Sequence, residues 1–214
     1  MLKIKRTLDI MMTILLLFLM CYPIMDSQIH EILGVTMMIC FIIHHVLNRQ
    51  WYHSLLKGHY PLLRKIILII NTLLLIDLIL VFISGLTMSD IFPFFNFIRA
   101  STARRLHMSL THWSFILMAI HLGLHLQSML IPIQKRIKKS HFPHILMYIP
   151  YVLAIYGIVM FINYQWVDYL FILNEFFFFN PSINLPRMML DIFSIFLFFT
   201  ILTYIFIKYL MKRK

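Results

Sequence analysis

The sequence predicts an all-α integral membrane protein, a bundle of about six transmembrane helices. Of the 214 residues, 61% are hydrophobic and 13% are charged, and the mean hydropathy is +0.86. A soluble domain is close to half apolar and about a quarter charged. The apolar residues also gather in runs near the roughly 20 residues that a helix needs to cross the hydrocarbon core of a bilayer. Composition and run length therefore both exclude an ordinary soluble domain.

Six apolar windows are long enough to cross a bilayer as helices. They cover about Thr7 to Met25, Ile29 to Leu47, Ile66 to Leu86, Leu106 to Leu126, Ile145 to Asn163 and Met188 to Leu210. The first window follows a basic N-terminus, as a secretory signal would, but no small-residue cleavage site follows it and Cys21 lacks the preceding small residue of a lipoprotein signal. We therefore expect residues 1–26 to form an N-terminal transmembrane anchor and residues 27–214 to form a second, transmembrane domain.

The basic residues indicate membrane topology rather than nucleic-acid binding. The net charge is +11, but the charges lie in small groups between apolar runs and form no single basic face. Fifteen of the 19 Lys and Arg residues fall at the N-terminus, the C-terminus and the second–third and fourth–fifth connections, which lie on one side if the spans alternate. The positive-inside rule then places both termini in the cytoplasm, and we expect a prokaryotic cytoplasmic membrane.

Two long connections are expected on the outer side, Thr87 to Arg105 and Tyr164 to Arg187. The second contains DYLFILNEFFFFNPSINLP, which is too apolar for a freely solvated loop and is interrupted by Asn180, Pro181 and Pro186. We expect it to lie in the membrane interface as a short amphipathic or re-entrant piece. The only cysteines, Cys21 and Cys40, lie inside apolar runs, so a disulfide framework and a Cys-x-x-Cys metal site are both excluded.

Histidines recur with the same spacing in the second and fourth windows. His30 and His44 are fourteen residues apart, and so are His107 and His121. Fourteen helical residues rise roughly 21 Å and return to within about 40° of the same face. Because one span intervenes, the two helices run in the same direction, which places His30 level with His107 near the outside and His44 level with His121 near the inside. The spacing predicts two level pairs of imidazoles, stacked across the bilayer.

Two facing neutral imidazoles between apolar helices suit an axially ligated haem iron. The c-type attachment motif is absent, so each haem would be a noncovalent b-type group with His30, His44, His107 and His121 as the metal ligands. The alternative is that each histidine only forms hydrogen bonds between helices. The matched spacing on two parallel helices favours the haem interpretation and a haem-binding bundle like that of cytochrome b.

Three further residues near these ligands are candidates for cofactor binding. Arg104 and Arg105 lie within one turn of His107, where a haem propionate is expected to emerge, and an arginine fork suits a carboxylate. Positive charges also commonly cap a span, and that alternative stays open. His125 lies one turn beyond His121 and could contact a propionate, tune the ligand, replace it, or be a polar residue at a helix end.

Other polar residues in the windows have simpler interpretations. His112 is turned about 140° from His107 and is expected to pack between helices by hydrogen bonding. Glu31 is expected to be an interfacial carboxylate, with orienting a ligand or pairing with Arg104 or its neighbour as alternatives. Asp77, near the middle of the third window, must face the bundle interior, where it is either hydrogen-bonded structurally, which we favour, or on a proton path to a quinone.

Five segments of the chain resemble the flavinylation-associated cytochrome family, which was long catalogued as a domain of unknown function. They are HEILG (30–34), HHVLNRQW (44–51), SGLTMS (84–89), RRLHMSLTHWSFILMAIHLGLH (104–125) and YGIVMFINYQWVDYLFIL (156–173). The resemblance runs from about the second span to the sixth, so residues 27–214 would be the cytochrome-like domain. It implies a multi-helix haem b protein, distantly similar in ligand layout to the transmembrane domains of ferric reductases and NADPH oxidases.

The resemblance also implies ligand sets and partners. His30 and His107 would bind one haem, and His44 and His121 the other, with the HHVLN pattern favouring His44 over His45. The expected partner is an extracytoplasmic protein that carries covalently attached flavin, and a quinone and membrane lipid are further partners. Because the sequence contains neither a dinucleotide-binding glycine-rich loop nor a flavin-attachment motif, we expect an electron-transfer subunit of a membrane oxidoreductase system rather than a complete enzyme.

A second hypothesis is a metal or proton-coupled membrane transporter that uses the same histidines and Asp77. Such a transporter would need polar residues through the depth of the bundle and broken helices in a repeated arrangement. The histidines instead cluster at two levels, and no inverted repeat is visible in the sequence.

Overall fold

A computed structural model describes residues 2–55, 57–137, 148–173 and 183–212, and their regular structure is entirely helical. In chain order the elements are α1 (Leu2–Leu19), the short 3-10 helix η1 (Tyr22–Ile24), α2 (Ser27–Leu47), α3 (Gln50–Ser54), α4 (Leu62–Thr87), α5 (Ala100–Ile137), α6 (Ile149–Asn163), α7 (Trp166–Phe171) and α8 (Leu185–Lys212). The prediction of an all-α chain is confirmed for this part of the protein.

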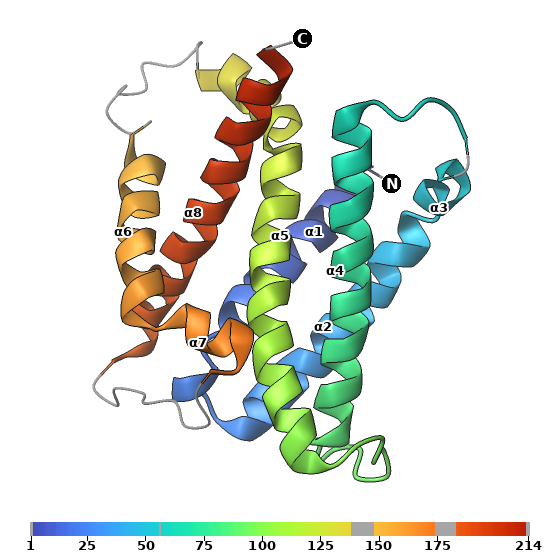
Figure 1. The fold of residues 1–214 in the computed structure, drawn as a ribbon, viewed down its shortest axis with the longest axis vertical. Coiled ribbons are helices and arrows are strands. Elements are labelled where there is room, and N and C mark those ends of the chain that lie inside the picture. The colour runs from blue at the N-terminus through green and yellow to red at the C-terminus, as the bar shows by residue number, and fades with distance from the viewer. Residues whose placement is uncertain (1, 56, 138–147, 174–182, 213–214) are drawn as a thin grey trace.

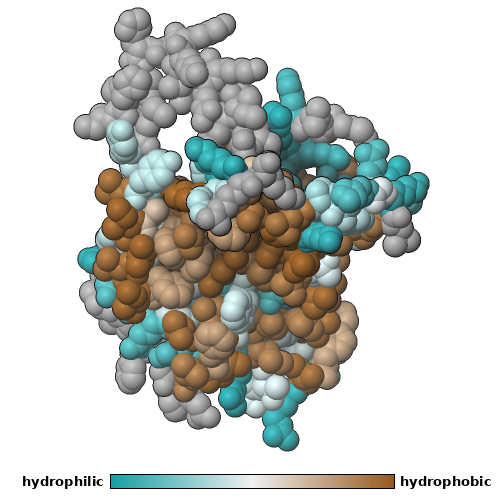
Figure 2. Space-filling view, turned by 45° about the horizontal axis from the view of Figure 1, so that its top comes forward, coloured by the Kyte–Doolittle hydropathy of each residue, from teal (hydrophilic) through white to brown (hydrophobic). Residues whose placement is uncertain are grey.

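In the described part of the chain, three helices are long and apolar enough to cross a membrane: α2, α4 and α8. The helix α6 is apolar but has only 15 residues, and the first residues of its predicted window, 145–147, lie outside the described part. Charged residues at the start of α1 and the four histidines of α5 lower the hydropathy of these two helices. Figure 2 shows hydrophobic side chains over the middle of the molecular face and hydrophilic ones mainly along its upper and lower edges, as expected of a membrane protein.

The long helices alternate in direction along the chain (Figure 1). In that view α1, α4 and α6 run downward and α2, α5 and α8 run upward, so α2 and α5 are parallel, as the histidine spacing requires. Both ends of the chain lie toward the upper end of the bundle. The helix α5 packs against α4, α7 and α8, while α6 packs on α8 and α1 packs on α2.

Close packing of α5 and α6 on α8 depends on glycine. A Cβ at Gly123 would lie 2.6 Å from the Thr200 carbonyl oxygen and 2.7 Å from the Thr203 Cβ. A Cβ at Gly157 would overlap the Ser194 carbonyl group. Any larger residue would force these helices apart, and small residues are what allow membrane helices to approach so closely.

The apolar connection after α6 contains the short helix α7, which packs on α5. Its Leu170 carbonyl oxygen accepts hydrogen bonds from the Ser109 hydroxyl at 2.8 Å and from Trp113 Nε1 at 3.0 Å. These donors satisfy a carbonyl group that the end of a six-residue helix leaves unpaired. Trp166 is only 2% exposed, so α7 is buried against the bundle. Part of the expected interfacial piece, residues 174–182, lies outside the described residues.

Candidate functional site

The predicted pair His30–His107 is brought together by α2 and α5. The Asp26 side chain caps α2 by accepting hydrogen bonds from the backbone N–H groups of Gln28 and Ile29, which fixes the helix start and places His30 in its first turn. The ring centroids of His30 and His107 are 6.4 Å apart, with an angle of 83° between the ring planes. Two imidazoles bound to opposite sides of one metal ion, through bonds of roughly 2 Å, have centroids roughly 6 Å apart. At this separation the two rings could hold one metal ion between them.

His107 is oriented by α4 through its Nδ1 atom. Nδ1 is 3.1 Å from the Val81 carbonyl oxygen and 3.1 Å from the Ser84 hydroxyl oxygen. Because a carbonyl can only accept, the proton is on Nδ1 and Nε2 is left as a lone-pair donor. Gly85 makes room for this ring, since a Cβ there would lie 3.2 Å from its Cε1 atom. A histidine whose second nitrogen is held by a carbonyl is the usual arrangement of a metal ligand.

His30 has an unsatisfied nitrogen. Its Nδ1 atom is buried and has no hydrogen-bond partner among the described residues, while the ring of Tyr22 packs edge-on at 4.8 Å. Buried polar atoms without partners are rare and call for an explanation, such as a missing ligand or ion. Open space also lies one turn further along α2, because nothing lies within 4 Å of where a Cβ of Gly34 would be. Both observations fit a site built for a bound group.

The second predicted pair, His44 and His121, lies toward the other end of the bundle and is less tightly assembled. His121 interacts electrostatically with His44, Asp9 and His125. The centroid of the His44 ring, however, lies 5.5 Å from that of His45, and the centroid of the His121 ring lies 4.9 Å from that of His125. The structure therefore groups these histidines at one level without a ring contact between His44 and His121.

Each of these two histidines has an oxygen partner on a neighbouring helix. The Nδ1 atom of His44 is 2.9 Å from Asp9 Oδ1 in α1, and the Asn48 side-chain nitrogen lies 3.4 Å from His44 Nε2. The Nδ1 atom of His121 donates to Asn71 Oδ1 in α4 at 2.8 Å. The His121 bond leaves Nε2 unprotonated and oriented, as at His107, whereas Nε2 of His44 faces the Asn48 amide. Asp9 and Asn71 could not be identified as histidine partners from the sequence. Each is only a polar residue inside an apolar window.

His45 faces a different neighbour from His44. Its ring packs on Phe41 at 4.3 Å, and its Nδ1 atom is 2.5 Å from the Tyr52 hydroxyl oxygen in α3. Burial raises the pKa of the Tyr52 phenol above its usual value, which keeps this hydroxyl protonated. His44 and His45 thus each have a partner at Nδ1, and these contacts do not distinguish the two as ligands.

The loop after α4 is held by Glu31, next to His30. The Glu31 carboxylate accepts hydrogen bonds from the Ser89 hydroxyl and from the backbone N–H groups of Ile91 at 2.9 Å and Asp90 at 3.3 Å. The alternative that Glu31 pairs with the arginines is wrong for this structure, because the loop donors occupy the carboxylate. Arg104 and its neighbour Arg105 are exposed.

His112 packs between helices as predicted. Its ring stacks on Tyr169 at 4.5 Å with 14° between the planes, and it meets Trp166 edge-on at 4.8 Å. Its Nδ1 atom donates to the Met108 carbonyl oxygen at 2.7 Å. These contacts attach α7 to α5 and give His112 a structural role.

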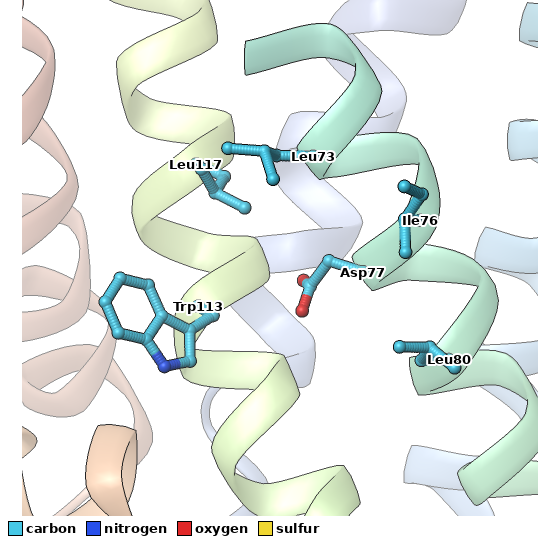
Figure 3. Close-up of a pocket in the computed structure, with 6 residues that line it drawn as sticks. All are labelled: Leu73, Ile76, Asp77, Leu80, Trp113 and Leu117. Carbon is cyan, nitrogen blue, oxygen red and sulfur yellow. The ribbon is translucent and has the colours of Figure 1, made fainter. Parts of the chain in front are cut away.

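Asp77 faces α5 and is hydrogen-bonded, as the sequence predicted. The carboxyl group is 8% exposed, and its Oδ2 atom accepts a hydrogen bond from the Ser114 hydroxyl. It lies at a groove between α4 and α5 with a volume of about 360 Å³ (Figure 3). The remaining lining residues are apolar side chains, namely Leu73, Ile76, Leu80, Trp113 and Leu117.

A second buried carboxylate, Asp191, was not identified from the sequence. It is 1% exposed and accepts hydrogen bonds from the hydroxyls of Tyr156 at 2.6 Å and Tyr164 at 2.7 Å. The two phenols satisfy one oxygen each, as a buried carboxylate requires. This cluster links α6 to α8, and the aspartate inside the sixth apolar window was its only sequence signal.

Within the described part of the chain, no group of three or more His, Cys, Asp or Glu side chains could hold a metal ion. A transporter of bare metal ions would therefore find no ligand cluster there. No protein-family model, curated protein or solved structure matches the chain.

Proposed function

We propose that this protein transfers electrons across a membrane through two b-type haems, as a subunit of a larger oxidoreductase system. The observation that favours this function most is the His30–His107 pair, whose rings are 6.4 Å apart. His44 and His121 are the proposed ligands of the second haem, with His125 beside His121. Haem iron, when bound, supplies one-electron redox chemistry that no amino-acid side chain here offers.

The chain contributes ligand orientation. The Val81 carbonyl, the Asn71 amide and the Asp9 carboxylate each hold one Nδ1 atom, of His107, His121 and His44. Fixing the tautomer and rotation of the His107 and His121 rings in this way would present Nε2 as the ligand atom and strengthen binding. At His44 the Asn48 amide, 3.4 Å from Nε2, would have to move aside.

The proposed topology has six spans with both termini in the cytoplasm. The alternating directions of α1, α2, α4, α5, α6 and α8 support it, as do the two chain ends at one end of the bundle (Figure 1). The basic residues concentrate in the connections at that end, as the positive-inside rule expects. His30 and His107 would then lie near the outer surface, close to the exposed Arg104 and Arg105.

The proposed partner at that surface is an extracytoplasmic flavin-carrying protein, as the family resemblance implies. The exposed arginines offer either a propionate contact or an attractive surface for an acidic partner. A quinone is the further candidate for exchange of electrons within the membrane.

Electron transfer across a sealed vesicle tests this function. The purified protein is reconstituted with haem into lipid vesicles that contain ferricyanide, and dithionite is added outside. We expect reduction of the trapped ferricyanide to be much faster than in empty vesicles or in vesicles with the His107→Ala variant. The His112→Gln variant is the matched control on the same helix and should keep the activity. A haem-loaded protein that performs no better than empty vesicles would contradict the proposal.

A further inference from the structure

The groove between α4 and α5 has the features of a ligand site rather than a packing gap. Its volume of about 360 Å³ falls within the roughly 300–1,000 Å³ of small-molecule pockets, which are mostly apolar with a few polar groups. Figure 3 shows the Asp77 carboxyl group directed from α4 toward α5, which contributes Trp113 and Leu117 to the lining. The lining contains no basic residue, so the groove does not suit an anion.

Asp77 has one oxygen available in this groove. The Ser114 hydroxyl bonds to Oδ2, whereas no described residue donates a hydrogen bond to Oδ1. Oδ1 is also not fully buried, because His30 Nδ1 is the only buried side-chain polar atom without a partner in the described part of the chain. An acidic group in the middle of a membrane is costly unless its oxygens are satisfied. A ligand that donates a hydrogen bond to Oδ1 would remove this cost.

The groove opens toward the lipid rather than toward water. Ile76, on its rim, is 52% exposed in the middle of α4, a helix apolar enough to cross a membrane. A ligand would therefore enter from the hydrocarbon phase. Along α4, Asp77 lies six residues after Asn71 and seven before Ser84, which is roughly 9 Å and 10 Å of helix. These two residues contact His121 and His107, so the groove lies between the two histidine levels.

We propose that this groove binds the ring of a lipid-soluble hydroquinone, with one ring hydroxyl donating a hydrogen bond to Asp77 Oδ1. A flat apolar ring fits walls of leucine, isoleucine and tryptophan, and a phenolic hydroxyl supplies the donor that Oδ1 lacks. The inference rests on the proposed function for the role of this ligand as a membrane-borne electron carrier. Binding of the hydroquinone itself depends only on the groove and requires no haem.

Fluorescence quenching of Trp113 tests the inference directly. The purified full-length chain in lipid nanodiscs is titrated with a brominated, decyl-substituted hydroquinone, because bromine quenches a nearby indole. We expect saturable quenching that is lost in Trp113→Phe, since the other two tryptophans, Trp51 and Trp166, do not line the groove. Asp77→Leu, which removes the acceptor, should weaken binding roughly tenfold, the effect of losing a hydrogen bond to a charged acceptor.

Two matched comparisons separate this site from a groove filled by lipid chains. Ile76→Phe should block binding, whereas Ile79→Phe, at a position 43% exposed on the same helix but outside the groove lining, should not. The dimethoxy analogue, which has no hydroxyl donor, should bind the unsubstituted protein as weakly as the hydroquinone binds Asp77→Leu. Equal binding of the two compounds, or quenching that Ile76→Phe leaves unchanged, would overturn the inference.

The outcome of the quenching experiment is independent of the outcome of the electron-transfer test. Saturable binding by a protein that takes up no haem would support the groove and contradict the proposed function. A protein that binds two haems but gives no saturable quenching would support the function and overturn the groove.

Discussion

Replacement of Asn71 by leucine removes the acceptor that orients His121. The Asn71 Oδ1 atom is 2.8 Å from His121 Nδ1, and leucine has a similar volume without a hydrogen-bonding group. A buried donor left without a partner costs about 1–3 kcal/mol, and each 1.4 kcal/mol is about tenfold in an equilibrium constant. Loss of such a partner typically weakens metal binding by about 10- to 100-fold. We therefore expect one of the two haems to dissociate at least roughly tenfold faster.

The assay is transfer of haem to excess apomyoglobin, followed by visible absorption. The Asn71→Leu variant should show one fast and one unchanged phase, because His30 and His107 do not contact Asn71. Asn71→Asp keeps an oxygen acceptor and should retain both haems, and Thr72→Val, an exposed neighbour, should behave like the unsubstituted protein. Dissociation of both haems from a folded Asn71→Leu variant at the unsubstituted rate would refute the assignment of Asn71.

Three further substitutions test the packing around the site. Gly157→Val should lower the thermal unfolding temperature in detergent, because its side chain would overlap the Ser194 carbonyl at a cost of roughly 1–3 kcal/mol; an unchanged temperature would contradict the close α6–α8 packing. Asp191→Leu should destabilise by about 1–3 kcal/mol by leaving two tyrosine hydroxyls unpaired, with Asp191→Asn as the milder control in the same melt. Glu31→Ala should release the loop after α4 and speed chymotryptic cleavage at the exposed Phe94, and equal cleavage rates would show that Glu31 does not hold the loop.

The helices could be predicted because bilayer thickness and helical rise set the length of an apolar run. The second window, Ile29 to Leu47, nearly matches α2 (Ser27–Leu47). The fourth window, Leu106 to Leu126, is shorter than α5 (Ala100–Ile137), because a helix can continue past the apolar region where hydropathy no longer marks it. The short helix α7 could not be placed, since its position depends on contacts with α5.

The proximity of His30 and His107 was predictable because it depends on a single helix period. Fourteen-residue spacing put His30 and His107 at one level because helix geometry is the same wherever a helix forms. The partners of His44 and His107 could not be predicted, because Asp9 and Val81 come from helices whose rotation about their own axes the sequence does not specify. Packing decides which polar atom meets which ring, and so these contacts appear only in the folded bundle.

The proposed function requires that the chain binds two haems through paired histidines. The most direct measurement is the visible spectrum of the detergent-purified protein, oxidised and dithionite-reduced, with haem counted per chain by the pyridine haemochrome method. We expect two b-type haems with low-spin bands that shift on reduction, and the loss of one haem in His30→Ala and in His107→Ala. A folded protein that stays colourless when expressed with ample haem would contradict the claim.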